Sequence, residues 1–362
     1  MRPCPKRFFR VGGPLIIVFS LLLLTACAAY DGPQTTLTPQ GSSSRAILDL
    51  YTVILIMAAI VFVVVEGLLI YSVVRYRRRP EDGIPLQIHG NKPVEIAWTI
   101  IPALIVLFLA TMTFRTQSLL VQPVKNPLHV TVIGHQWWWE FRYPDYQVVT
   151  ANELHLPANR DVEFRLESVD VIHSFWIPRL FGKTDVIPGH VNTLTFTPEN
   201  TTSPIFVRGE CAEFCGGTHA QMGMYAVVEP QAQFDTWVKQ QQAKANPPAG
   251  VTQGAAAPQA NAQATSPAAR GYALFKTKGC VGCHSIAGYP EAKGQIGPNL
   301  THVASRSSIV AGWLPNTPAN LQRWLRDPNA VKPDNIMGTA IKAGTLKEDE
   351  IAALSAYLRS LK

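Results

Sequence analysis

Residues 211–222 read Cys-Ala-Glu-Phe-Cys-Gly-Gly-Thr-His-Ala-Gln-Met and carry the clearest chemical signal in the chain. Cys211 and Cys215 are followed by His219 and Met222, and His173 precedes them. Thiolates, imidazoles and a thioether are soft or borderline ligands, which select copper over magnesium or calcium. A blue-copper centre needs one cysteine and an iron–sulfur cluster usually needs four, so two cysteines fit a pair of copper ions best.

Two other interpretations of these cysteines remain open. An oxidising compartment favours a Cys211–Cys215 disulfide, and two cysteines with two histidines also match a zinc site. Neither explains why Met222 and Glu213 stand in the same loop.

The sequence around this loop predicts a β-sandwich over residues 115–240. Segments such as 162–166 (Val-Glu-Phe-Arg-Leu) and 194–196 (Leu-Thr-Phe) alternate apolar and polar residues, and Pro188-Gly189 marks a turn. Period-two alternation is typical of half-buried strands. A short helix around residues 234–239 is expected to close this domain.

The N-terminal residues predict a targeting segment. Basic residues precede an apolar stretch, 14–24, which ends in Leu-Thr-Ala-Cys at residues 24–27. This pattern indicates a secretory signal over residues 1–27. Lipidation of Cys27 after lipoprotein-type cleavage and ordinary cleavage near Ala26-Cys27-Ala28 are equally compatible with it.

Two further apolar runs, 47–74 and 94–114, predict a transmembrane hairpin. Each exceeds the roughly 20 helical residues that cross a hydrocarbon core of about 30 Å. The loop between them carries Arg75, Arg77, Arg78, Arg79 and Lys92, and clustered positive charge marks the cytoplasmic side. The following domains are therefore expected outside the cytoplasm of a bacterium, in a multi-pass protein of the plasma membrane.

The C-terminal part predicts a second soluble domain with a covalent haem. Residues 241–269 are mostly Ala, Gln, Pro and small polar residues, a composition that predicts a flexible linker. A coil of this length reaches about 30 Å. Residues 270–362 contain helical patterns at 271–278, 318–326 and 347–361, typical of a small all-α domain around a cofactor.

The string Cys280-Val-Gly-Cys283-His284 is a C-x-x-C-H motif, in which two thiols bind the porphyrin and the histidine binds iron. Met337, the one methionine after the motif, is the predicted distal ligand, with His302 as the rival. The segment resembles monohaem cytochromes c, whose patterns include Gly297-Pro298-Asn299-Leu300. It departs from them at Gly338, where that family often has proline.

Charge distinguishes the two soluble parts. Residues 115–240 contain nine Lys or Arg against thirteen Asp or Glu, whereas residues 270–362 contain twelve against six. Opposite net charge favours docking of the two domains, chiefly by orienting them during encounter.

The copper loop, together with residues 134–139 (Gly-His-Gln-Trp-Trp-Trp) and 173–178 (His-Ser-Phe-Trp-Ile-Pro), closely resembles subunit II of haem–copper cytochrome c oxidase. With the haem domain, the chain resembles the fused caa-type form. This resemblance implies a cupredoxin-like sandwich and a binuclear copper centre. The implied copper residues are His173, Cys211, Glu213 (through its carbonyl), Cys215, His219 and Met222.

The resemblance implies further roles. The Glu213 side chain would face a magnesium ion at the junction with subunit I, and Trp137 would receive electrons. Core packing is the alternative for Trp137, and it is favoured for Trp138 and Trp139. Glu95, in Glu-Ile-Ala-Trp-Thr-Ile-Ile-Pro (95–102), matches a glutamate at the mouth of a proton pathway into subunit I; a snorkelling interfacial glutamate is the alternative.

The sequence thus predicts the electron-input subunit of a terminal cytochrome c oxidase coupled to proton translocation. Its expected partners are subunit I, subunit III and a cytochrome c or similar donor, with no nucleic acid. The copper subunit of a nitric oxide reductase and a free-standing membrane-anchored electron shuttle are the alternatives. A quinol oxidase is disfavoured because that relative lacks the copper ligands. The membrane spans contain no histidine that could bind a second haem.

Overall fold

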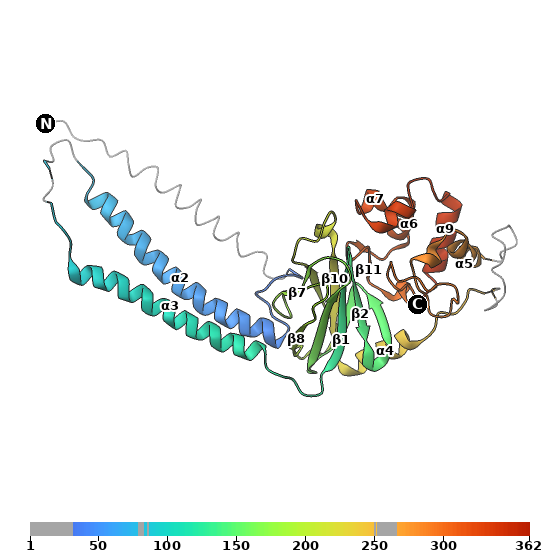
Figure 1. Ribbon diagram of the computed structural model, residues 1–362, viewed down its shortest axis with the longest axis horizontal. Coiled ribbons are helices and arrows are strands. Elements are labelled where there is room, and N and C mark those ends of the chain that lie inside the picture. The colour runs from blue at the N-terminus through green and yellow to red at the C-terminus, as the bar shows by residue number, and fades with distance from the viewer. Residues whose placement is uncertain (1–31, 79–82, 85–86, 250, 252–265) are drawn as a thin grey trace.

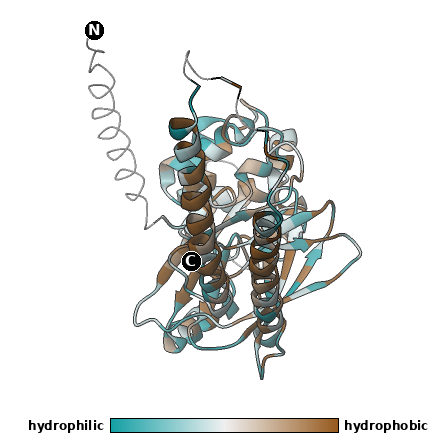
Figure 2. Ribbon diagram, turned by 90° about the vertical axis from the view of Figure 1, so that its left-hand side faces the viewer, coloured by the Kyte–Doolittle hydropathy of each residue, from teal (hydrophilic) through white to brown (hydrophobic). Residues whose placement is uncertain are grey.

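The computed structural model describes residues 32–78, 83–84, 87–249, 251 and 266–362. The predicted signal segment 1–27 lies outside the described residues. Two long helices, α2 (Ser42–Arg75) and α3 (Lys92–Leu120), lie side by side and extend away from the two soluble domains (Figure 1). Most of their residues are hydrophobic (Figure 2), and both helices are long and apolar enough to cross a membrane.

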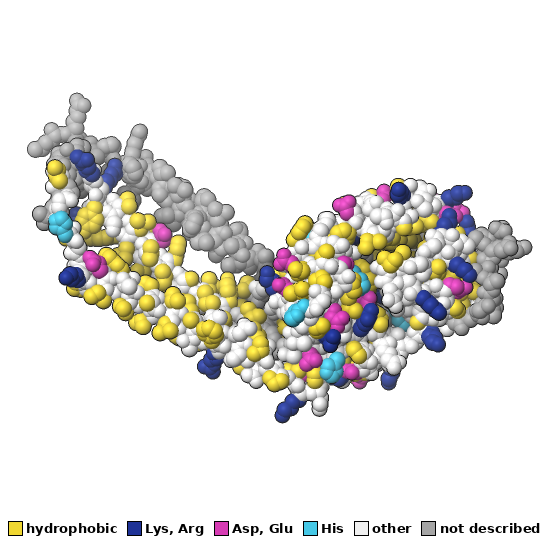
Figure 3. Space-filling view, viewed as in Figure 1, with side chains coloured by type: hydrophobic (Ala, Val, Ile, Leu, Met, Phe, Trp, Pro, Cys, Tyr) yellow, Lys and Arg dark blue, Asp and Glu magenta, His cyan; other side chains and the backbone are white. Residues whose placement is uncertain are grey.

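Both helices are joined to the sandwich at the same end of the hairpin. Residues at the start of α2 and just before it bind the sandwich through the backbone: Gln40 N–H donates to the Arg179 carbonyl and Ser42 N–H donates to the Thr197 carbonyl. Arg45 pairs with Glu199. Charged side chains gather on the soluble domains and at the far end of the helices, with an apolar band between them (Figure 3).

The third apolar run forms a longer helix than predicted, so the start of the predicted sandwich, 115–120, is helical. No proline or glycine interrupts residues 103–122, and nothing therefore stops α3 before Leu120. The first strand begins at Leu128.

The sandwich consists of two five-stranded sheets, ordered β3-β2-β1-β5-β8 and β4-β10-β9-β6-β7. Along β1 the side chains of Leu128, Val130 and Val132 are buried while His129 is exposed, as the alternating pattern requires. The strands are β1 (Leu128–His135), β2 (Trp138–Tyr143), β3 (Val148–Ala151), β4 (Glu153–Pro157), β5 (Val162–Ser168), β6 (His173–Trp176), β7 (Thr184–Val186), β8 (Asn192–Phe196), β9 (Ile205–Cys211) and β10 (Gly223–Glu229).

The predicted closing helix is α4 (Gln231–Gln242), which packs Phe234 and Trp237 against Tyr143 of the sandwich. The chain then continues onto the second domain, since Ala245 N–H donates to the Ala287 carbonyl. The predicted linker, 241–269, is shorter in the structure, because residues 241–242 end α4 and residues 267–269 begin α5. The contact at Ala245 uses backbone atoms, which the amino-acid composition does not reveal. Residues 252–265 lie outside the described part.

The C-terminal domain is helical, as predicted. Helices α5 (Pro267–Thr277) and α9 (Glu348–Leu358) pack closely because Gly271 has no side chain; a Cβ there would lie 2.0 Å from the Ala353 carbonyl oxygen. The remaining elements are α6 (Pro318–Arg326), α7 (Pro328–Val331), α8 (Ile336–Ala340), the two-residue strands β11 (Ser308–Ile309) and β12 (Leu314–Pro315), and short 3-10 turns. The chain is therefore a two-helix hairpin, a cupredoxin-like domain and a cytochrome c-like domain.

Candidate copper and haem sites

The two cysteines of the copper loop lie together in the sandwich core. Cys211 ends β9, and the loop that follows returns to β10 through the 3-10 turn η2 (His219–Gln221). The two Sγ atoms are 3.8 Å apart, much farther than the ~2.05 Å of a disulfide bond. Both thiols are free and buried.

His173, at the start of β6, faces these sulfurs. Its Nδ1 lies 3.8 Å from the Cys211 Sγ, while its Nε2–H donates to Asp170 at 2.8 Å. Asp170 also accepts from the backbone N–H of Gln136. This carboxylate leaves Nδ1 free to bind a metal ion, as outer-sphere carboxylates commonly do. Gly134 is required beside the ring, because a Cβ there would lie 2.7 Å from the His173 Cδ2.

The other three predicted copper residues join the same cluster. The Cys215 Sγ lies 3.5 Å from the His219 Nδ1 and 3.7 Å from the Met222 Sδ. The Glu213 carbonyl oxygen lies 3.2 Å from the Cys211 Sγ, and the Glu213 side chain is exposed. The loop therefore brings all six residues together, with the Glu213 carboxylate turned outward.

The ionisation of the two cysteines favours metal binding at this cluster. The hydrogen bond from the Cys215 thiol lowers the pKa of Cys211 to about 4, and the same contact raises the pKa of Cys215 above its ordinary value. Two adjacent sulfurs resist ionising together because like charges repel. Bound cations would favour the thiolate form of both, so the donor set fits a copper site.

The three tryptophans of residues 137–139 have different surroundings. Trp137 donates its indole N–H to the Cys215 carbonyl at 2.9 Å. Trp138 stacks on His135 and packs against Ala311 of the C-terminal domain. Trp139 is fully buried beside His173, with ring centroids 5.8 Å apart. Trp139 is thus a core residue, whereas Trp137 touches the copper loop.

The C-terminal domain contains a cavity of about 320 Å³ lined by Cys280, Cys283, His284 and Met337. The His284 Nδ1–H donates to the Pro298 carbonyl at 2.9 Å, which leaves Nε2 free for iron. Gly297 permits this approach, because a Cβ there would lie 2.5 Å from the His284 Cε1. These residues fit a covalently attached haem.

The structure separates the two distal candidates. Met337 lines the cavity in α8, whereas His302 is not among the lining residues and its Nε2–H donates to the Gln241 and Ala243 carbonyls. Local contacts explain why position 338 is occupied by glycine and not by proline. Its N–H donates to the Asn335 Oδ1 at 2.7 Å, and a Cβ at this position would lie 2.2 Å from the Asn329 Oδ1.

The haem cavity opens onto the copper domain. Its lining includes Gln136, Trp137, Trp138, Ala151 and Asn152 of the sandwich. Trp137 is therefore part of the cavity wall on one side and hydrogen-bonded to the copper loop on the other.

Glu95 has a local structural role at the start of α3. Its carboxylate accepts from the backbone N–H of Asn91 at 3.0 Å, and the Asn91 side chain accepts from Val94. Such reciprocal bonds satisfy backbone donors that a helix start leaves unpaired.

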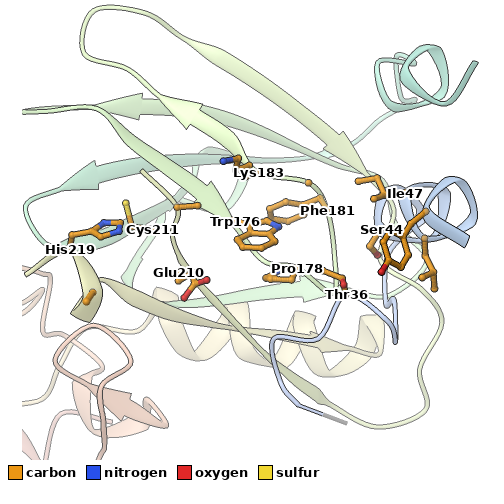
Figure 4. A pocket seen from close by; sticks show the side chains of 15 residues that line it. Thr36, Ser44, Ile47, Trp176, Pro178, Phe181, Lys183, Glu210, Cys211 and His219 are labelled. Atoms are coloured by element: carbon orange, nitrogen blue, oxygen red, sulfur yellow. The ribbon is translucent and has the colours of Figure 1, made fainter. Parts of the chain in front are cut away.

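A hollow of about 800 Å³ lies between the copper loop and the first turns of α2 (Figure 4). Cys211 and His219 border one end, Ser44 and Ile47 the other, and Trp176 lies between them. The hollow thus connects the copper cluster with the membrane side of the domain.

Sequence reasoning missed two polar residues of these sites. Asp170 orients His173, and its position three residues before that histidine was a usable signal. Lys332 lines the haem cavity and bonds to the copper domain, and no feature of its sequence surroundings indicated this.

Three family models match the chain. The transmembrane domain of cytochrome c oxidase subunit II matches residues 34–116, the periplasmic domain of that subunit matches 147–229, and cytochrome c matches 268–362.

Curated relatives are similar along 80–96% of the chain. Cytochrome c oxidase subunit 2 of Alkalihalophilus pseudofirmus is 32% identical over 355 residues, 96% of each protein. The subunit of Bacillus sp. strain PS3 is 39% identical over 303 residues, 80% of each protein. That of Bacillus subtilis is 33% identical over 373 residues, 96% of this chain and 97% of the relative.

Proposed function

Because this chain belongs to the cytochrome c oxidase subunit II family, we propose that it takes electrons from a donor onto its own haem c and passes them to a copper pair. From there they would reach subunit I, where oxygen is reduced with coupled proton translocation. The observation that carries this proposal is the position of Trp137. Its indole bonds to the Cys215 carbonyl, and the residue also lines the haem cavity.

We assign the cofactor ligands as follows. Cys280 and Cys283 form the haem thioethers, with His284 and Met337 on the iron. Each cofactor, when bound, supplies reversible one-electron chemistry. The copper pair is held by His173, Cys211, Glu213 through its carbonyl, Cys215, His219 and Met222.

The contribution of the protein is to hold the copper ligands in place, most of them buried. His173 is fully buried, Cys211 and Cys215 are 5% and 3% exposed, and Met222 is 1% exposed. A water-excluded, hydrogen-bonded site needs little rearrangement when its charge changes.

Trp137 is the proposed electron-input residue of the copper domain. In the docked arrangement Trp137 lines the haem cavity and is only partly exposed. The external donor, a cytochrome c or similar protein, would therefore deliver electrons to the haem domain.

The outward-facing groups suggest where the partners lie. Subunit I would cover the hollow beside the copper loop, and the exposed Glu213 carboxylate would bind magnesium at that junction. Glu95 would stand at the mouth of a proton pathway in addition to capping α3. Subunit III would complete the assembly.

We place both soluble domains outside the cytoplasm of a bacterial plasma membrane. Both lie beyond the same end of the hairpin, and the basic loop lies at the other end. Residues 1–27 would act as the signal, cleaved either as a lipoprotein signal that leaves Cys27 lipidated or at an ordinary site near Ala26-Cys27-Ala28.

Purification of the complex from its native membrane tests this function. We expect a large haem-containing subunit to copurify with the chain, and the complex to consume oxygen with a reduced c-type donor. Consumption of nitric oxide without oxygen turnover would identify a nitric oxide reductase. Isolation of the chain alone would identify an electron shuttle.

A further inference from the structure

Lys332 is a buried lysine at the boundary between the two soluble domains. It follows α7 and is 4% exposed. Its ammonium donates to the Trp137 carbonyl at 2.6 Å and to the Gln221 carbonyl at 3.1 Å. Trp137 lies in the turn between β1 and β2, and Gln221 immediately precedes Met222. One side chain of the haem domain therefore bonds to two separate segments of the copper domain.

This environment is unusual for a lysine. Among the described residues, no carboxylate forms an ion pair with Lys332, and burial lowers its pKa to about 7. Burial of an ammonium without an opposite charge is costly, even where carbonyl oxygens accept its protons. An apolar residue would fill the position at lower cost, so packing alone does not account for a lysine there.

The same lysine is tied to the distal side of the haem cavity. The Asn335 side-chain amide donates to the Lys332 carbonyl, and its Oδ1 accepts from Gly338, the residue after Met337. Lys332 also lines the cavity. The segment from Lys332 to Gly338 thus connects the copper domain to the proposed distal ligand through a short series of hydrogen bonds.

We propose that Lys332 is a positioning residue for transfer between the two cofactors: its ammonium fastens the distal segment of the haem domain to Trp137 and to the loop that carries Met222. This inference rests on the proposed function, because it assumes that haem and copper occupy the sites described above.

Other contacts hold the domains together more generally. Gly223 N–H donates to the Ala311 carbonyl at 3.0 Å, and Glu153 accepts from Ser307 N–H at 2.8 Å. Within the described residues, none of the recorded salt bridges joins the two domains. Loss of Lys332 should therefore leave the domains associated but loosen their alignment at Trp137.

The test uses the whole oxidase complex with three variants. Lys332→Met removes the charge and both hydrogen bonds at similar volume, whereas Lys332→Gln keeps a donor. Lys342→Met is the matched control, since Lys342 is exposed on the same domain. Rapid photoreduction of the haem, followed by absorption of both cofactors, gives the rate of transfer from haem to copper.

We expect Lys332→Met to slow this transfer about tenfold, the scale of a lost hydrogen bond to a charged group. The rate should also become dependent on solvent viscosity, because the domains must then search for alignment. Lys332→Gln should give an intermediate rate and Lys342→Met the parent rate. Haem and copper contents should remain unchanged, and the viscosity dependence separates lost alignment from a change in driving force caused by loss of the charge.

Hydrogen exchange supplies a readout that is independent of turnover. The Gly223 amide, which bonds to Ala311 across the boundary, should exchange faster in Lys332→Met than in the parent complex. A parent-like transfer rate without viscosity dependence, or unchanged exchange at Gly223, would overturn the proposal for Lys332. Absence of haem-to-copper transfer in the parent complex would instead overturn the proposed function.

Discussion

The copper loop and the haem cavity hold their candidate ligands in different ways. Around the two cysteines, side-chain atoms already lie 3.5–3.8 Å from one another and are fixed by strand ends and by Asp170. In the haem domain, four candidate ligands line a cavity of about 320 Å³. The copper centre is therefore preformed by the protein, whereas the haem domain needs its cofactor to complete the core.

Cys215→Ser gives the largest expected effect and tests the preformed side of this contrast. Cys215 contacts Cys211, His219 and Met222, so its loss removes the centre of the cluster. We expect loss of both coppers, of their near-infrared absorption and of oxidase turnover, with an intact haem spectrum. Metal analysis and absorption spectroscopy measure this. Phe214→Leu is the control, because it changes an exposed side chain of the same loop, and it should keep both coppers bound.

Replacement of Cys280 and Cys283 together by serine tests the cofactor-dependent side. Without haem, the apolar residues that line this cavity would lose their packing partner, and burial of apolar surface is the main stabilising contribution in a small domain. We expect residues 270–362 to become sensitive to protease while the copper absorption persists. A protease-resistant haem domain in this variant would show that it, too, is preformed.

Met337→Leu should have a smaller effect, confined to the iron. The haem should stay attached, because the cysteines and His284 are unchanged. Its midpoint potential should fall by on the order of 100 mV, a fraction of the ~0.8 V over which axial ligands tune haem. Potentiometric titration measures this, with His302→Gln as the control. A shift in the control and none in Met337→Leu would exchange the two assignments.

Glu153→Gln tests a contact between the two regions and should have the smallest effect. Burial opposes ionisation of Glu153, but hydrogen bonds from His155 and Ser307 hold its pKa below the ordinary 4.5. Its stabilising contribution is therefore present above pH 4.5 and is lost as the pH falls through the lowered value. We expect a loss of about 1–3 kcal/mol at pH 7 that shrinks below pH 4.5.

Denaturant titrations over this pH range measure the difference. Asp185→Asn, at an exposed carboxylate on β7, should match the parent protein at every pH. A Glu153→Gln deficit that is the same at pH 4 and pH 7 would show that its charge makes no contribution.

The sequence was most informative where ligands are close together along the chain. The copper loop places five of its six candidate residues within twelve positions, and the haem motif occupies five. Ligand chemistry therefore identified both sites before their geometry was known. The cores of the two domains were similarly predictable, because strand alternation and helical spacing reflect which side chains are buried.

Contacts between distant backbone groups were not predictable in this way. Lys332 bonds to the carbonyls of Trp137 and Gln221, and any residue type offers a carbonyl. In the sequence, Gly338 was only a departure from a family pattern. The contacts that explain this glycine involve Asn329 and Asn335, whose positions only the structure gives. Opposite net charges favoured docking of the domains, yet the recorded contacts across the boundary are hydrogen bonds and packing.

The copper pair is the central claim, and metal analysis combined with paramagnetic resonance of the purified full-length chain tests it most directly. We predict two coppers and one covalent haem per chain, with an unpaired electron shared between two copper nuclei. A single copper, a zinc ion, or a Cys211–Cys215 disulfide in the freshly purified protein would contradict the account.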